Sequence, residues 1–246
     1  MKRLAWMIVA ACSLLYTPTF GQPRLSPPWT YQSNEGDYVL SLPTGWRQVT
    51  KVEFEAQAKL FKERTGNIAP NYDSGFQLAD REPFEYPYPY IFVQRAIPRP
   101  MSYDQLKVQV DSQMLSRAAK EASGKLAAVL APIRFTAIHL FEEKKVIVMD
   151  FDSNADDRPA MKGMTAWYLG RQGVLSINFY AYNDNYGEYA ATFQQILDSF
   201  KYLPGYEYQG PPPFYATWDI SRIVSAAIIA AMLSLFGFRR RKKTAS

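Results

Sequence analysis

Cysteine and histidine are almost absent from this sequence, since its 246 residues contain one of each. Cys12 lies in an apolar N-terminal stretch, so the rest of the chain has no thiol for a disulfide, for thiolate catalysis or for a cysteine-ligated zinc site. A catalytic triad or a metal site around His139 would need partners that the composition does not supply. Because His139 alternates with Phe135, Ala137 and Phe141, we expect a strand histidine that is packed or half exposed.

Signatures of common enzymes are also missing. The 13 glycines are scattered at turns, and no phosphate-binding loop or serine nucleophile elbow is visible. Carboxylates are adjacent at Glu142-Glu143 and at Asp156-Asp157, but neighbours on a strand point to opposite faces and make poor acid–base pairs. We therefore expect a protein that is not an enzyme and holds no cofactor.

Two alternatives to an accessory or protein-binding role stay open. An envelope hydrolase could work with carboxylates alone, which requires two of them about 5 to 9.5 Å apart in one cleft. A small-molecule or lipid carrier would instead have an apolar pocket of roughly 300 Å³ or more between helix and sheet.

Positive charge is scarce between the two ends of the chain. The net charge of +5 falls to −2 once seven terminal cations, namely Lys2, Arg3 and the five of residues 239–243, are left out. A slightly acidic domain has no electrostatic footprint for DNA or RNA. We therefore expect no nucleic-acid partner.

The N-terminus has the pattern of an export signal over residues 1–21. Lys2 and Arg3 precede an apolar run from Leu4 to Tyr16, and Thr19-Phe20-Gly21 offers a cleavage site. The sequence leaves open whether this segment is cleaved, retained or lipidated at Cys12. The orientation is the same in each case, because the cations stay in the cytoplasm.

The C-terminus has the pattern of a membrane anchor. Residues 220–238 are apolar apart from a few positions, and Arg239, Arg240 and Arg241 open the basic tail 239–246. Trp218 and Arg222 lie where an interfacial anchor belongs. We expect a transmembrane helix in the lipid bilayer of a bacterial-type inner membrane, with the main domain outside the cytoplasm and the tail inside.

The exported part divides into a domain and a stalk. Residues 31–204 are enough for one domain with a real core. Residues 205–219 contain Gly210-Pro211-Pro212-Pro213, which is typical of a stiff spacer that holds a domain away from the bilayer.

In the first half of the domain, the pattern predicts a strand over Tyr38–Leu42, closed by a turn before Trp46. Two helices are expected behind capping boxes, one at Thr50 with Glu53 and one at Ser102 with Gln105. Between them we expect a long irregular excursion over residues 67–89 and a strand over residues 90–94.

The second half predicts an antiparallel meander and a final helix. The expected strands cover residues 133–140, 145–151, 164–169 and 174–182. Tyr189, Phe193, Ile196, Leu197 and Phe200 share one face of the helix that follows. The fold class is therefore α+β, with an antiparallel sheet flanked by helices in an α/β/α sandwich.

Two segments carry a resemblance to a known family. The strand that runs into Pro43-Thr44-Gly45-Trp46, and the helix that runs into Ser199-Phe200, resemble the PsbP-like superfamily over roughly residues 31–203. The resemblance implies a non-enzymatic accessory or binding role beside membrane complexes, and it brings no catalytic residues. The helix of residues 51–65 and the excursion after it look like additions to the family pattern.

An acidic run gives a candidate metal site. Asp150, Asp152, Asn154 and Asp156 alternate like the first half of a calcium loop. Ala155 stands at the glycine position of such a loop, so only weak calcium binding is expected. A hairpin with solvated acids explains the same pattern.

A tyrosine-rich run gives a candidate partner surface. Tyr86, Tyr88 and Tyr90 alternate with prolines, which hold the chain extended and present rigid aromatic rings. The alternative is that these tyrosines cover an edge of the domain's own core. The favoured function is a membrane-anchored accessory or binding protein with a membrane or envelope protein as its partner.

Overall fold

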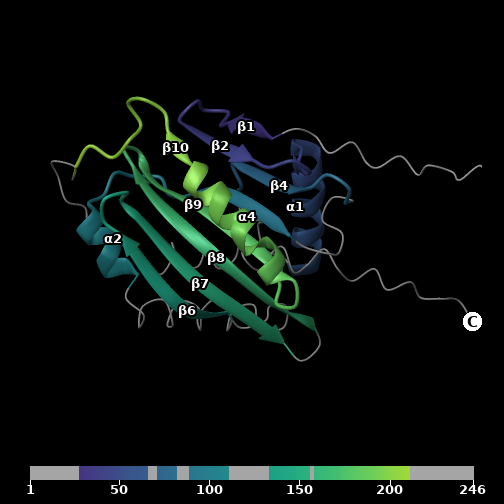
Figure 1. Ribbon diagram of the computed structural model, residues 1–246. Coiled ribbons are helices and arrows are strands. Elements are labelled where there is room, and N and C mark those ends of the chain that lie inside the picture. The colour runs from purple at the N-terminus through teal and green to yellow at the C-terminus, as the bar shows by residue number, and fades with distance from the viewer. Residues whose placement is uncertain (1–27, 66–70, 82–88, 111–132, 156–157, 211–246) are drawn as a thin grey trace, which may run out of the picture.

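The computed structural model describes residues 28–65, 71–81, 89–110, 133–155 and 158–210 (Figure 1). The expected signal segment and transmembrane helix, the anchor residues Trp218 and Arg222, and the basic tail all lie outside these ranges. Within the described ranges, no helix is long and apolar enough to cross a bilayer.

The described chain forms ten strands and three helices. In chain order they are β1 (Trp29–Gln32), β2 (Tyr38–Leu42), β3 (Trp46–Gln48), α1 (Lys51–Thr65), β4 (Ser74–Leu78), β5 (Tyr90–Ile97), α2 (Tyr103–Gln109), β6 (Ile133–Phe141), β7 (Val146–Ala155), β8 (Arg158–Gly170), β9 (Gly173–Tyr182), α4 (Tyr186–Ser199) and β10 (Lys201–Tyr202).

The strands form two antiparallel sheets, where a single sheet was expected. The large sheet has the order β3-β4-β5-β9-β8-β7-β6, and the small sheet has the order β1-β2-β10. The chain leaves the small sheet at Pro43 and enters the large one at Trp46, with Gly45 between them at φ 88°. This positive φ suits glycine and turns the backbone so sharply that β2 and β3 pair with different strands.

Each face of the large sheet is covered. On one face, α4 and the small sheet pack together and bury Phe193 and Ile196 of α4 against Leu40 of β2 (Figure 1). On the other face, Leu106 of α2 and Phe54 of α1 pack against the sheet. Helices therefore flank the sheet as expected, but the small sheet shares a layer with α4.

Local sequence signals set the ends of the first two helices. Thr50 N donates to Glu53 Oε2 at 2.6 Å, and Glu53 N donates to Thr50 Oγ1 at 3.3 Å. Ser102 and Gln105 form the same reciprocal pair at the start of α2. Both capping boxes predicted from the sequence are confirmed, because each satisfies two backbone N–H groups that the helix leaves free.

The two hairpins expected in the second half are confirmed. β6 and β7 meet at the turn after Phe141, with Phe141 paired to Val146. β8 and β9 meet at a two-residue turn, with Gly170 paired to Gly173. The buried face of α4 is confirmed as well, since Phe193, Ile196 and Leu197 are all buried.

The expectation of an irregular excursion over residues 67–89 is wrong in its middle. Ser74–Leu78 forms β4, which pairs with β3 on one side and β5 on the other. A Cβ on Gly75 would lie 2.5 Å from Phe54 Cζ and 2.9 Å from Phe92 Cδ1. Gly75 therefore lets two aromatic rings pack against β4, because a side chain at this position would clash with both.

Candidate functional site

One charged side chain interrupts the buried strand β5. Tyr90–Ile97 is otherwise apolar except for Gln94, and every residue in it is buried apart from Arg95. Arg95 lies where β5 passes the end of the small sheet, with its side chain 24% exposed. A guanidinium in this position needs partners, because burying an unpaired charge is costly.

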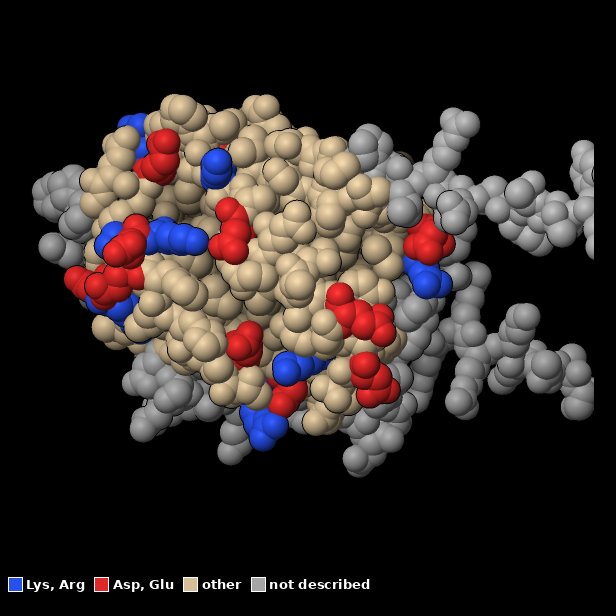
Figure 2. Space-filling model, viewed as in Figure 1, with Lys and Arg blue, Asp and Glu red and all other residues tan. Residues whose placement is uncertain are grey.

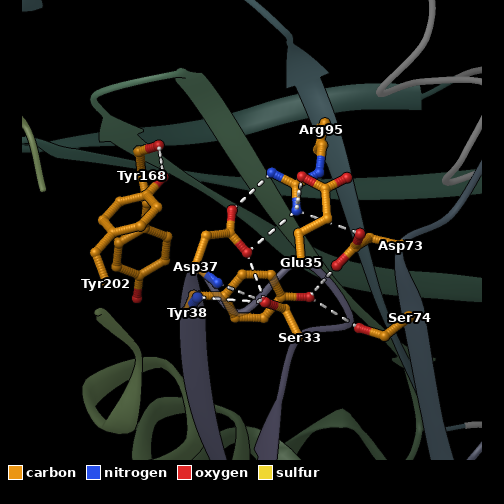
Figure 3. Close-up of polar contacts among 9 residues, drawn as sticks. All are labelled: Ser33, Glu35, Asp37, Tyr38, Asp73, Ser74, Arg95, Tyr168 and Tyr202. Atoms are coloured by element: carbon orange, nitrogen blue, oxygen red, sulfur yellow. Dashed lines mark hydrogen bonds and ion pairs between the residues drawn. The ribbon is translucent and has the colours of Figure 1, made fainter. Parts of the chain in front are cut away.

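Asp37, immediately before β2, is the main partner of Arg95 (Figure 3). Arg95 Nη1 donates to Asp37 Oδ2 at 2.7 Å, and Nη2 donates to Asp37 Oδ1 at 3.2 Å. Ser33 Oγ donates to Asp37 Oδ1 at 2.5 Å, while Asp37 N donates back to Ser33 Oγ at 3.0 Å. The turn between β1 and β2 thus presents a carboxylate, only 3% exposed, in fork-to-fork geometry.

Two more carboxylates surround the same guanidinium. Glu35 Oε2 lies 3.2 Å and Asp73 Oδ1 lies 3.5 Å from Arg95 Nη2. Tyr38 Oη donates to Asp73 Oδ2 at 2.5 Å and lies 3.2 Å from Ser74 Oγ. The network, which we call the Arg95 network (Ser33, Glu35, Asp37, Tyr38, Asp73, Ser74 and Arg95), joins the small sheet to β4 and β5 (Figure 3).

The network shifts the pKa of three of its members, Asp37, Arg95 and Tyr38. Burial alone would raise the pKa of Asp37, but the hydrogen bonds from Arg95 and Ser33 outweigh it and hold this pKa below its usual range. Burial likewise works against the charge on Arg95, and Asp37, Asp73 and Glu35 together raise its pKa. Burial and the nearby charge of Asp73 raise the pKa of Tyr38, which stays a neutral donor.

A cavity of about 540 Å³ opens beside this network. Glu35, Asp37 and Arg95 supply part of its charged and polar lining, and Arg171 and Gln172 of the β8–β9 turn supply the rest. The remaining lining is mostly apolar or aromatic and consists of Ile97, Pro98, Pro100, Gly173, Val174, Leu175, Tyr202 and Tyr206. This volume and mixed lining lie within the usual range of small-ligand sites.

The cavity is held in shape by contacts on several sides. Arg171 N donates to Tyr206 O at 2.9 Å, and its Nη1 donates to Gly205 O at 3.2 Å. Tyr202 Oη donates to Tyr168 O at 3.0 Å. The segment after β10 is therefore fastened across the β8–β9 turn, and the cavity is formed before any ligand arrives.

Chemically, this arrangement suits binding better than proton transfer. Asp37 is ionised and engaged by Arg95, and Tyr38 is neutral and engaged by Asp73. Groups locked in such pairs orient a ligand, whereas a general base needs a pKa near the working pH.

No protein-family profile matches this chain, and no curated protein sequence does either. The structure is similar to the solution structure of cyanobacterial PsbP (CyanoP) from Synechocystis sp. PCC 6803. The TM-score is 0.50 at 12% identity, over 74% of this chain and 96% of that one. The chain has a PsbP-like fold.

Two further solved structures are similar at lower TM-scores. The Ran-binding protein Mog1p of Saccharomyces cerevisiae has a TM-score of 0.39 at 7% identity, over 72% of this chain and 95% of that chain. LpqN, involved in cell envelope biogenesis of Mycobacterium tuberculosis, has a TM-score of 0.37 at 14% identity, over 75% and 88%. At these identities the likeness concerns the fold alone.

The PsbP-like fold confirms the resemblance expected from the sequence. Trp46, after the Pro-Thr-Gly turn, is 3% exposed and lies in the core between β2 and α4. Phe200, at the end of α4, is 8% exposed and contacts Tyr168 with ring centroids 4.0 Å apart. Both motifs act structurally, as the resemblance implied.

The candidate calcium residues of the PsbP-like domain lie on a strand. Asp150, Asp152 and Asn154 belong to β7, and Asp156 lies outside the described residues. Asp150 Oδ2 lies 3.2 Å from His139 Nε2, and Asp152 Oδ2 lies 2.6 Å from Arg134 Nη2. An extended strand with its acids paired across to β6 differs from the loop that a calcium site of this kind requires. Over the described ranges, no group of three or more acidic, histidine or cysteine side chains is placed to hold a metal ion.

The candidate partner tyrosines do not form one surface among the described residues. Tyr90 is the first residue of β5, 2% exposed, and its ring stacks on Phe92 at 5.7 Å. Its proposal as a surface contact is therefore wrong, because the ring fills the core under α2 and α1. Tyr86 and Tyr88 lie outside the described residues.

His139 behaves as expected from its alternation with apolar neighbours. It lies on the outermost strand of the large sheet, β6, with its side chain 52% exposed. A register shift between Phe135 and Ala137 interrupts the alternation that the sequence showed. The histidine is half exposed, which confirms the plain structural interpretation.

Sequence reasoning missed every member of the Arg95 network. The available signal was Arg95 itself, a cation inside a run of strongly apolar strand residues. Such a residue indicates a buried ion pair, but its partners Asp37 and Asp73 lie 58 and 22 positions away and carry no motif.

Proposed function

We propose that this chain is a non-catalytic accessory or binding protein of the cell envelope, anchored in the membrane with its PsbP-like domain outside the cytoplasm. The observation that carries the binding role is the cavity of about 540 Å³, which is lined by Glu35, Asp37 and Arg95 of the Arg95 network. A preformed cavity with its polar groups already oriented loses little entropy when a partner or ligand enters.

The favoured occupant of the cavity is an anchoring side chain from a membrane or envelope protein. Interfaces commonly place one large side chain of the partner in a preformed pocket, with charged groups around its rim. Tyr202 and Tyr206 would contact the body of such a side chain, and Glu35 and Arg171 would contact polar groups beside it. Glu35 is 58% exposed, so it is accessible to a partner.

A second candidate is a small-molecule carrier, and the volume of the cavities favours it. Besides the cavity at Arg95, one of about 400 Å³ lies between the end of α4 and the large sheet. Both exceed the roughly 300 Å³ at which small-ligand sites begin.

The binding proposal is tested by crosslinking the full chain in its own membranes and identifying what is attached by mass spectrometry. Gln172→Trp, in the exposed β8–β9 turn, places a large ring in the lining of the cavity, and Lys59→Trp, on an exposed position of α1, is the matched control. A defined protein lost with Gln172→Trp and retained with Lys59→Trp supports the accessory role. A chain that crosslinks to no protein contradicts it, and a small molecule released on denaturation would then favour the carrier.

The anchoring proposal has its own test. Alkaline extraction should leave the full chain in the membrane fraction, and deletion of residues 220–246 should release it. Protease added from outside should degrade the domain in spheroplasts that keep a cytoplasmic marker intact. Recovery of the full chain in the soluble fraction would contradict the anchor.

A further inference from the structure

Large apolar side chains are exposed mainly at one end of the domain. Those with the highest exposure among the described residues are Val52 (73%), Val108 (67%), Leu140 (50%) and Phe141 (46%). Leu140 and Phe141 end β6 at the β6–β7 hairpin, and Val108 is in α2. Lys107 of α2 binds Glu142 of the hairpin turn at 2.9 Å, so α2 and the hairpin lie together.

The described chain also finishes at this end. Tyr208 lines the cavity of about 400 Å³ together with Phe141, Lys144 and Lys145. In Figure 1, the yellow-green segment after β10 lies toward α2, and the α1 end of the molecule, which carries Val52, lies on the opposite side. The hairpin tip and the exit of the chain toward its C-terminus therefore share one end.

The length of chain beyond Gly210 limits how far this end can be from a membrane. About ten residues separate Gly210 from the expected span at residue 220, and an extended chain covers at most about 3.6 Å per residue. The exit point can therefore be no more than about 36 Å from the bilayer surface. An anchored domain can therefore bring its hairpin end to the bilayer surface.

The charges at this end are largely paired with one another. Lys107 binds Asp104 at 2.8 Å as well as Glu142, and Lys144 binds Asp198 at 3.3 Å. Figure 2 shows Lys and Arg beside Asp and Glu at the left-hand end of the molecule, with neither sign dominant. A surface with balanced charge gains little from anionic lipid, so its contact with a membrane depends on apolar side chains.

We infer that the β6–β7 hairpin is a second membrane contact, in which Leu140 and Phe141 enter the boundary between headgroups and acyl chains of the outer leaflet. The inference rests on the proposed membrane anchor and goes beyond it, because it fixes the orientation of the domain on the bilayer. The two side chains end the outermost strand and extend to opposite sides of it, so both enter lipid when the hairpin meets the bilayer with its tip. The ion pairs next to these side chains carry little net charge, which suits the dipolar headgroups of a neutral lipid.

The inference is tested with the full chain in phosphatidylcholine vesicles that contain no other protein. In a Cys12→Ser background, Leu140→Cys carries an environment-sensitive fluorophore, and Val52→Cys, at the other end of the domain, is the matched control. Lipids with a nitroxide near the headgroup should quench the probe at residue 140 at least about twofold more than the probe at residue 52, because the hairpin enters about 5–10 Å into the interface. Equal quenching at the two positions would overturn the inference and favour a protein partner for the tip.

Two further measurements separate this inference from the anchor itself. Flotation of the vesicles reports the anchor, so a chain that fails to float contradicts the proposed function, whereas a floating chain with an unquenched residue 140 contradicts only the hairpin contact. Phe141→Ser should lower the quenching at residue 140 while the circular dichroism spectrum stays unchanged. Quenching that disappears in 1 M salt would overturn the apolar basis of the contact, because salt screens charge and not apolar burial.

Discussion

Arg95 and Asp37 join the two sheets of this domain through a pair of hydrogen bonds, at 2.7 and 3.2 Å between the guanidinium and the carboxylate. Arg95 belongs to the large sheet, and Asp37 stands at the entrance to the small one. The same pair forms a wall of the larger cavity. Stability and the candidate binding site therefore depend on one interaction.

Removing the guanidinium should destabilise the protein strongly. Arg95→Met leaves the carboxylate of Asp37 buried with only Ser33 as a side-chain donor and without its cation. We expect the free energy of unfolding to fall by about 3 kcal/mol, in the range for a broken buried ion pair. The measurement is urea unfolding of the full chain in detergent. Asp37→Asn combined with Arg95→Met should restore part of the loss, and Lys51→Met, in an exposed pair on α1, should leave the midpoint unchanged. A loss no larger than that of Lys51→Met would show that the pair contributes little.

Acid should weaken the same interaction. The pKa of Asp37 in the folded protein lies below its ordinary 3.8, so its contribution is fully present above that value and declines as the pH falls through the folded-state pKa. We expect the wild-type chain and Asp37→Asn to differ most in unfolding free energy above the ordinary pKa of 3.8, and to converge as the pH falls below it and through the folded-state pKa. Unfolding curves at a series of pH values measure this difference. A difference that stays constant over this range would contradict the lowered pKa.

Two glycines should respond in opposite ways to alanine. A Cβ on Gly163 in β8 would clash with Phe179 O and with Phe151 Cζ. A Cβ on Gly187 in α4 would meet nothing within 4 Å. Gly163→Ala should therefore lower the melting temperature, and Gly187→Ala should stabilise the protein by about 0.5–1 kcal/mol because alanine favours the helix. Equal changes in stability for the two variants would mean that β8 can move away from Phe151 without destabilising the protein.

Tyr90 should matter for stability and not for recognition. Tyr90→Ala removes a ring that is 2% exposed and stacks on Phe92, so we expect a loss of about 3–5 kcal/mol. Tyr86→Ala and Tyr88→Ala remain tests of the partner surface, and crosslinking of those variants should be compared with denaturant unfolding of all three. A Tyr90→Ala variant of normal stability that loses its partner would restore Tyr90 as a contact residue.

Calcium should not bind at the acidic run of β7. Asp150 and Asp152 are paired with His139 and Arg134 and lie on an extended strand, so the described residues of the run do not surround a cation with oxygens. We expect millimolar calcium to leave the amide resonances of residues 150–154 unchanged in a nuclear magnetic resonance titration. Saturable shifts confined to these residues would show a calcium site, and magnesium is the control for general ionic effects.

Local patterns predicted most of the individual elements. The Thr50–Glu53 and Ser102–Gln105 boxes, the hairpin turn between Gly170 and Gly173 and the apolar face of α4 depend on residues within a few positions of each other. Their geometry is set by backbone hydrogen bonds and side-chain spacing, which the sequence displays directly. The motifs at Trp46 and at Phe200 also led to the correct prediction of a PsbP-like fold.

Strand order and the candidate site were decided by tertiary structure. β4 is only five residues long and contains a glycine, and it is a strand because β3 and β5 supply hydrogen bonds on both sides. Tyr90 is buried because α1 and α2 cover its face of the sheet. The residues around Tyr90 in the sequence do not indicate that these helices pack there.

Helix starts, hairpin turns and most strands follow from local patterns in the sequence, and its charged ends indicate the membrane orientation that is proposed. Asp37, Asp73 and Arg95 came together beside a cavity through the packing of the two sheets. The difference lies in the distance along the chain over which each interaction acts. Caps and turns are stabilised by neighbours along the chain, whereas an ion pair between residues 58 positions apart exists only after two sheets have packed and excluded water from it.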